Sequence, residues 1–302
     1  MEQSDIVQAF QQVRANFPFA GYMNTGLDKY LAIISRIARQ YPPSESKILS
    51  IGCGPCDLEA ILSKLGYDVT GIDDLKDQWH LIGENRERIK SFAKSMDIDL
   101  ITEPANSTHQ KENYFHVVLL IDIIEHLHES PRELLNYSIS LLQPGGLLLV
   151  ETPNAVSLGK RLKVLFGKSS QVSAEFFYWN IGEYRSHVRE YTQSELKQIL
   201  SYHNLIDIDS KMMNIMIIDM FEGGNFFKKA VVKAYQLVSG LYPNFRDTIL
   251  ISGKKPKDWQ PTETSIKTFS KYYRHIGKYN LDNEPDEILV NKMSRYLKEE
   301  ML

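Results

Sequence analysis

The stretch Ile48-Leu49-Ser50-Ile51-Gly52-Cys53-Gly54-Pro55-Cys56-Asp57 decides the fold. Its apolar start predicts a buried strand, and the glycine-rich turn runs straight into a segment, residues 58–65, whose apolar residues have helical spacing. In a doubly wound α/β sheet, nucleotide-type ligands bind at such a turn because glycine lets the backbone approach the ligand closely. The stretch therefore predicts a ligand at the carboxyl end of the first strand.

An acid downstream of the turn narrows the choice of ligand. Asp73 lies 21 positions after Gly52, at the end of the next predicted strand, where a carboxylate can accept hydrogen bonds from ribose hydroxyls. A dinucleotide would need glycine at position 57, with its pyrophosphate at the helix N-terminus, and Asp57 would repel that group. S-adenosylmethionine has no phosphate and carries a cationic sulfonium and ammonium. We therefore expect S-adenosylmethionine as cofactor and disfavour NAD.

Around this stretch, short apolar runs alternate with helical patterns, which is typical of a parallel sheet covered by helices. A break at Pro144-Gly145-Gly146 precedes the fifth strand, and Pro42-Pro43 ends a predicted helix over Leu27–Tyr41. A second helix, Thr192–Leu200, begins with the reciprocal capping pattern of Thr192 and Glu195. The predicted strands are Lys47–Ile51, Asp68–Ile72, Asp97–Ile101, His116–Ile121, Leu147–Glu151, Leu205–Asp209 and Asp247–Gly253.

The composition excludes several classes of protein. With 302 residues, of which 43% are hydrophobic, the chain can bury a substantial core. A net charge of −3 gives no general attraction to nucleic acid, so no nucleic-acid partner is expected. Without a basic-apolar leader or an apolar run of about 18 residues, we expect a soluble, cytoplasmic protein. The sequence does not fix an oligomeric state.

The two cysteines, Cys53 and Cys56, are too few for a disulfide scaffold or a four-thiolate zinc site. The run Cys53-Gly54-Pro55-Cys56 also has thioredoxin-like redox spacing, in a strand-to-helix turn where thiol pKa values are often low. That alternative leaves Asp73 unexplained. We therefore favour two small side chains that line the cofactor loop.

Taken together, these motifs resemble the class I methyltransferase family, in particular bacterial members with a Glu-His pair after the fourth strand. The resemblance covers about residues 45–210 and depends on the order of six motifs: Gly52-Cys53-Gly54, Val69-Thr70-Gly71-Ile72-Asp73, Phe115-His116-Val117-Val118, Glu125-His126-Leu127, Pro144-Gly145-Gly146-Leu147 and Thr152-Pro153-Asn154. Two positions depart from the family pattern. Ser50 stands where many members have an acid, and Cys56 stands where many have glycine.

The resemblance implies a Rossmann-like, doubly wound, mostly parallel sheet of seven strands with a reversed last strand. Residues 1–46 are expected to form an N-terminal helical cap, and residues 47–255 the cofactor-binding domain, with helical lid insertions near 155–190 and 212–246. Residues 256–302 are expected to form a C-terminal helical tail, with Ile288 and Leu297 on one face of its last helix. The predicted cofactor-binding residues are Gly52, Cys53, Gly54, Asp73, Asp74, Asn106 and Asp122.

Polar residues after the fourth strand indicate the acceptor side. His126 can take a proton from a hydroxyl at neutral pH, or it can merely shape the pocket wall together with Glu125. His187 lies in His187-Val188-Arg189-Glu190-Tyr191-Thr192, which resembles the segment that folds over the active site in these enzymes. Glu125, His126 and His187 are therefore the predicted catalytic residues. A divalent ion is an alternative, because four residues are similar to the ion's ligands in small-RNA 2′-O-methyltransferases and, in part, in quinone-pathway O-methyltransferases: Asp122, Glu125, His126 and His187. Our main expectation is a site without a metal.

The insertion after the fifth strand begins with a short basic and apolar segment, residues 158–168. One interpretation is an amphipathic cap in peripheral contact with a membrane or a phosphate-bearing substrate; the other is a lid helix with solvated lysines. The pattern from Asn154 to Gly167 resembles methyltransferases of bacterial polysaccharide and natural-product pathways. We expect O-methylation of a sugar, a glycolipid or another glycan- or lipid-linked small molecule. An N-methyltransferase and a non-catalytic S-adenosylmethionine-binding protein remain alternatives.

Overall fold

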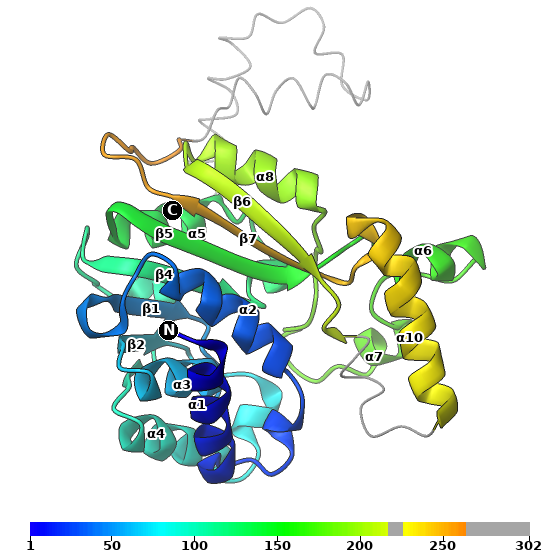
Figure 1. The fold of residues 1–302 in the computed structure, drawn as a ribbon, viewed down its shortest axis with the longest axis horizontal. Helices are drawn as coiled ribbons and strands as arrows, with labels where there is room; N and C mark the ends of the chain where they lie inside the picture. The colour runs from blue at the N-terminus through cyan, green and yellow to red at the C-terminus, as the bar shows by residue number, and fades with distance from the viewer. Residues whose placement is uncertain (217–225, 264–302) are drawn as a thin grey trace, which may run out of the picture. The chain divides into compact units, whose positions relative to one another are not determined.

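The structure is a computed structural model that describes residues 1–216 and 226–263 (Figure 1). Contacts divide the chain into two units, Met1–Gln260 and Pro261–Leu302. The first unit holds all the elements described below, whereas the predicted tail helix with Ile288 and Leu297 lies outside the described residues. No helix in the two described ranges is long and apolar enough to cross a membrane.

Seven strands form one sheet in the order β3-β2-β1-β4-β5-β7-β6. Neighbouring strands are parallel except β7, which runs antiparallel to both β5 and β6. This confirms the predicted Rossmann-like sheet. The strands are β1 (Lys47–Ile51), β2 (Asp68–Ile72), β3 (Asp99–Ile101), β4 (Phe115–Ile121), β5 (Leu142–Pro153), β6 (Ile206–Met213) and β7 (Thr248–Lys254).

Helices cover both faces of the sheet because its central strands are apolar on both sides. Ile48, Val117 and Leu149 belong to a buried cluster that includes residues of α1, α2, α3 and α4. Leu49 and Val118 belong to the cluster on the other face, with α5 and α8. The helices are α1 (Gln3–Asn16), α2 (Leu27–Ala38), α3 (Asp57–Lys64), α4 (Asn85–Ser95), α5 (Arg132–Leu141), α6 (Leu158–Leu165), α7 (Ala174–Tyr178), α8 (Gln193–Tyr202) and α10 (Phe226–Leu241).

Several predicted boundaries were wrong for local backbone reasons. Strand β3 begins two residues late because Asp97 has a φ of +56°, in the turn that ends α4. Strand β5 starts at Leu142, so the glycine pair interrupts its pairing with β4 instead of preceding the strand. Strand β6 continues to Met213 because its last residues pair with β7. Helix α2 ends at Ala38, three residues before the predicted end at Tyr41.

Helices α6, α7 and α10 lie on one side of the sheet, near the carboxyl end of β5 (Figure 1). Helices α6 and α7 fall in the predicted lid insertion near 155–190, and neither contains a buried residue. Helix α10 falls in the second predicted insertion, and the Asn214 amide donates to its Ser239 hydroxyl (2.7 Å). Whether these segments move as lids stays a prediction.

Candidate active site

The turn after β1 has the backbone conformation that its glycines were expected to allow. Gly52 has a φ of +73°, and its N–H donates to the Ile72 carbonyl at the end of β2 (2.7 Å). A Cβ at Gly52 would lie 1.9 Å from Cδ1 of Ile123, so no larger residue fits without displacing that side chain. A Cβ at Gly54 would meet nothing within 4 Å. The Ile123 side chain therefore fills the space next to Gly52, whereas the space next to Gly54 is free for a ligand to approach.

Asp73 is bound to this turn. Its Oδ2 accepts from the Gly54 N–H (2.8 Å) and its Oδ1 from the Leu75 N–H (2.7 Å). Burial raises the pKa of Asp73, although the two backbone hydrogen bonds oppose that shift. Each carboxylate oxygen keeps a lone pair for another donor. The predicted ribose acceptor therefore lies beside the glycine turn in a fixed orientation.

A second carboxyl, Glu59, was missed by sequence reasoning. Its side chain is buried in α3, its Oε2 has no hydrogen-bond partner among the described residues, and it contacts the hydroxyl of Ser50. Burial, followed by the charge of Asp57, raises the pKa of Glu59 to about 8. A carboxyl group therefore does lie beside position 50, where many members of the resembled family carry an acid. The available signal was an acid inside the apolar stretch 58–62.

Three further side chains meet where β4 and β5 end. The Lys29 ammonium, from the first turn of α2, forms ion pairs with Asp122 and with Oε2 of the buried Glu151 (2.9 Å to Glu151). Burial raises the pKa of Asp122, but Lys29 outweighs it and leaves that pKa below its usual value. The predicted cofactor residue Asp122 is thus held by a lysine that sequence reasoning also missed.

Two imidazoles lie next to each other at the mouth of this region. The rings of His126 and His187 are nearly perpendicular, with centroids 4.9 Å apart. The His126 Nδ1 lies 2.7 Å from the Arg185 carbonyl oxygen, and the His187 Nδ1 lies 2.9 Å from Oε1 of Glu190. Because both partner atoms are acceptors, each Nδ1 of a neutral ring carries the proton. Each Nε2 then has a free lone pair.

Glu125 lies beneath these rings and is fully buried. Its Oε2 accepts from the Thr152 hydroxyl (2.9 Å), and its Oε1 lies 3.8 Å from Nε2 of His126 with no hydrogen-bond partner in the described ranges. Burial, followed by the charge of Asp122, raises the pKa of Glu125 to about 7. Glu125 therefore places a carboxyl oxygen that has no hydrogen-bond partner among the described residues next to the His126 imidazole.

The segment before α8 holds the predicted site together. Its Val188 and Arg189 N–H groups donate to the Glu125 carbonyl (2.7 and 3.1 Å). The Arg185 guanidinium makes two hydrogen bonds to Asp74 (2.9 and 2.6 Å). Asp74, predicted to contact the cofactor, thus anchors this segment to the end of β2. The other predicted cofactor residue, Asn106, lies in the short helix Ala105–Ser107, and its side chain is outside what the structure describes.

The donor set also fits a divalent cation. One ligand atom each from Glu125, His126 and His187 lies within 4.8 Å of the others. Both imidazoles present Nε2 and are oriented through Nδ1 by an acceptor, as in metal sites with outer-shell support. Asp122, the fourth residue of the predicted set, is instead paired with Lys29.

Comparison with known proteins decides the family. Residues 20–208, more than half of the chain, match the family model for a methyltransferase domain. The chain belongs to this methyltransferase family. This membership confirms the predicted methyltransferase family.

Individual relatives agree with this family. Ubiquinone biosynthesis O-methyltransferase from Caulobacter sp. (strain K31) is 29% identical over 131 residues, which cover 42% of this chain and 49% of that protein. The mitochondrial enzyme of the same name from Rattus norvegicus is 26% identical over 130 residues, covering 42% of this chain and 36% of that protein. The methyltransferase thus spans about half the length, or less, of these curated relatives.

One solved structure supports the fold independently. Phosphoethanolamine N-methyltransferase 2 from Haemonchus contortus, in complex with S-adenosyl-L-methionine, superposes with a TM-score of 0.52 at 17% identity. The alignment covers 84% of this methyltransferase and 57% of that chain. At this identity, the likeness concerns the fold alone.

The cysteine pair of the methyltransferase does not have the environment of a redox site. Cys53 and Cys56 are both buried, with sulfur atoms 3.8 Å apart. The Cys56 contact and burial raise the pKa of Cys53, and burial raises that of Cys56 despite the opposing contact with Cys53. A reactive thiol needs a lowered pKa. The thioredoxin-like alternative is therefore not supported.

Proposed function

We propose that this methyltransferase methylates an oxygen of a small-molecule acceptor, with His126 as the general base. The observation that carries the proposal is the fixed tautomer of His126: the Arg185 carbonyl accepts from Nδ1–H, which leaves the Nε2 lone pair at the site. A hydroxyl of high pKa must lose its proton as it is methylated, and a positioned imidazole can accept it.

S-adenosylmethionine, when bound, supplies an electrophilic methyl group on a sulfonium and leaves as a neutral thioether. Gly52 and Gly54 would let the backbone approach it, and Asp73 would accept from its ribose hydroxyls. Asp57, at the start of α3, accepts from the Tyr30 hydroxyl and supplies a carboxylate that suits a cationic ligand.

Two kinds of support favour oxygen as the accepting atom. The imidazole base suits a hydroxyl, and the curated relatives from Caulobacter and rat are named O-methyltransferases. The N-methyltransferase alternative rests on likeness of fold. Transfer of tritium from labelled S-adenosylmethionine to phenols, sugars and amines, with the full chain, tests the proposal. Label in hydroxyl acceptors supports it, label only in amines supports N-methylation, and no transfer despite cofactor binding supports the non-catalytic alternative.

A metal-assisted version of the same reaction would use the same side chains. Glu125, His126 and His187 would hold the ion, which would lower the pKa of the acceptor hydroxyl.

The cofactor site gives a direct prediction. Replacing Asp73 by alanine should weaken S-adenosylmethionine binding by about 1.5–3 kcal/mol, the range for hydrogen bonds to a charged group, because the ribose acceptor and the anchor of the Gly54 N–H are both lost. Isothermal titration calorimetry measures the change. Asp68→Ala, at the other end of β2, is the matched control, because the Asp68 side chain is 62% exposed and pairs with Lys47. Equal affinity in the Asp73 variant and the wild type would contradict the placement.

We further propose that the acceptor is glycan- or lipid-linked and is met at an anionic membrane surface, on the cytoplasmic side. The support is a surface formed by α6, α7 and α10, together with Phe166 and Trp179, which directly follow α6 and α7. We call it the lid surface. Phe176, Phe177, Tyr178 and Trp179 are all more than half exposed there, as are Leu165 and Phe166 of the α6 end. Neither α6 nor α10 contains an acidic residue, whereas both contain lysines. Exposed aromatic and basic side chains together are typical of helices that lie on membranes.

The membrane contact predicts selective binding to vesicles. The full chain should sediment with phosphatidylglycerol vesicles and much less with phosphatidylcholine vesicles. Replacing Phe177 and Trp179 by serine should lower the bound fraction about fivefold or more, because interfacial binding scales with buried apolar area. Leu81→Ser and Ile82→Ser together are the matched control, since both side chains are exposed outside the lid surface. Equal loss in both double variants, or no vesicle binding by the wild type, would exclude this contact.

A further inference from the structure

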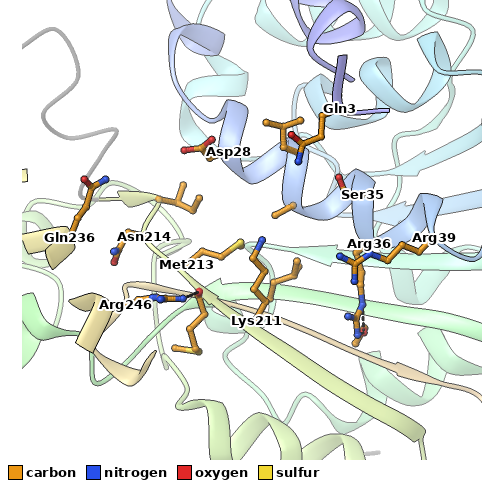
Figure 2. A pocket seen from close by; sticks show the side chains of 17 residues that line it. Gln3, Asp28, Ser35, Arg36, Arg39, Lys211, Met213, Asn214, Gln236 and Arg246 are labelled. Atoms are coloured by element: carbon orange, nitrogen blue, oxygen red, sulfur yellow. Dashed lines mark hydrogen bonds between the residues drawn. The ribbon is translucent and has the colours of Figure 1, made fainter. Parts of the chain in front are cut away.

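A cavity of about 640 Å³ lies between α2 and the outer strands β6 and β7 (Figure 2). Helix α2 belongs to the buried cluster with α1 and α3, so the cavity opens on the face opposite α5 and α8. None of its lining residues belongs to the glycine turn or to the cluster of Glu125, His126 and His187. Its volume falls within the range of small-molecule sites.

The walls of this cavity are strongly cationic. Arg36, Arg39, Lys211 and Arg246 line it, and Asp28 is the one acidic residue in the lining. The Arg36 guanidinium is already bound to Asp209 and to the Ser252 hydroxyl. No ion pair or hydrogen bond of the Arg39 or Lys211 side chain is found within the described part of the chain.

The sheet fixes the position of Lys211. In the register of the outer strands, Lys211 pairs with Leu250, which pairs in turn with Glu151. Paired residues on neighbouring strands point to the same face, so Lys211 faces α2, as does Glu151 where it meets Lys29. In Figure 2, Lys211 reaches up toward α2 from the middle of the pocket, and Arg36 and Arg39 lie to its right.

The rest of the cavity carries one of the lining cations, Arg246, whose guanidinium donates to the Met212 carbonyl (2.9 Å). Leu250 and Met213 contribute apolar, almost fully buried surface. Asn214 and Gln236 lie toward the other end (Figure 2), and Oδ1 of Asn214 is buried without a hydrogen-bond partner among the described residues. The cavity thus offers a cationic end, an apolar floor and an amide end.

We propose that this cavity is a second ligand site, which binds a small organic anion. Its phosphate or carboxylate group lies between Arg39 and Lys211, and its apolar body lies over Leu250 and Met213. Arg36 is neutralised by Asp209, but Arg39, Lys211 and Arg246 have no ion-pair partner within the described residues, and like charges around one cavity repel one another unless an anion neutralises them. Among the residues that the structure describes, the Arg39 and Lys211 side chains have no ion-pair or hydrogen-bond partner, which leaves their donors available to an acidic group. The site goes beyond the proposed methyl transfer.

Calorimetric titration of the full chain with phenyl phosphate tests the proposal. We expect one saturable site, little binding of phenol, and affinity at least about tenfold weaker in Arg39→Gln/Lys211→Gln. The matched control is Lys94→Gln/Lys197→Gln, which removes two exposed cations from α4 and α8 and should change affinity less than about twofold. S-adenosylhomocysteine should bind all three proteins alike, because the cavity is separate from the cofactor turn.

Three results would overturn the second site. They are no saturable binding of phenyl phosphate to the wild type, equal weakening in the two double variants, and loss of S-adenosylhomocysteine affinity in parallel with phenyl phosphate. The last result would place the phosphate in the cofactor site. Because cofactor binding is measured on the same samples, failure of the second site is distinguishable from failure of the proposed function.

Discussion

Replacing His126 by alanine should lower turnover by roughly 10²–10⁴-fold while leaving cofactor affinity nearly unchanged. The Arg185 carbonyl accepts from Nδ1–H of His126, so the lone pair of Nε2 remains available to take a proton. Cofactor affinity should not change because the cofactor contacts are expected at the glycine turn and Asp73, and His126 belongs to neither. Turnover comes from initial rates with the best acceptor of the panel, and affinity from calorimetry. The matched control is His109→Ala, because His109 is exposed and does not belong to the cluster of Glu125, His126 and His187; this variant should act as the wild type.

Related variants separate the base from the metal mechanism. If His126 is only a base, His187→Ala should be milder and chelator should leave the wild type active. If a divalent ion binds, Glu125→Ala, His126→Ala and His187→Ala should all act alike, and chelator should inactivate the wild type. Near-normal turnover in both histidine variants would contradict both mechanisms. The acceptor would then be an amine, a thiol or an acidic hydroxyl that needs no base.

Replacing Lys29 by methionine should lower the free energy of unfolding by about 3–5 kcal/mol, the cost of leaving a buried charge without its partner. Lys29 is the cation that pairs with Glu151, whose side chain is only 3% exposed. Burial already raises the pKa of Glu151, and loss of the ammonium would raise it further. Urea denaturation followed by circular dichroism measures the change.

Two controls give this prediction its specificity. Lys47→Met removes a lysine whose partner, Asp68, is 62% exposed, and it should cost less than about 1 kcal/mol. Adding Glu151→Gln to Lys29→Met should recover part of the lost stability, because the unpaired charge is removed. If Lys29→Met costs no more than Lys47→Met, then Lys29 does not neutralise a buried carboxylate.

The sheet could be predicted because its information is local. The turn at Gly52, the alternation of strands and helices from residue 47 to 151, and the capping pattern at Thr192 all depend on near neighbours in sequence. The reciprocal cap of α8 is present, with the Thr192 hydroxyl accepting from the Glu195 N–H (3.2 Å). Strand β6 was harder, because Asp207, Asp209 and Lys211 weaken its apolar pattern and the strand depends on pairing with β7.

Sequence motifs identified most residues of the candidate site, but they did not predict the long-range ion pairs that hold the site together. Glu125, His126 and His187 were suggested by motif, and the structure brings them together. Lys29, by contrast, meets Glu151 across 122 positions of sequence, so no local pattern marks it. The Arg185 pair with Asp74 has the same origin. Long-range ion pairs depend on the packing of α2 and of the segment before α8 against the sheet, and sequence spacing does not encode them.

A crystal structure of the full chain with S-adenosylhomocysteine is the most direct test of the central claim. We expect ribose hydroxyls within hydrogen-bond distance of Asp73, backbone contact at Gly52 and Gly54, and the sulfur directed toward the side where His126 presents Nε2. Ligand density away from this turn, or a ribose without contact to Asp73, would contradict the assignment of the cofactor site.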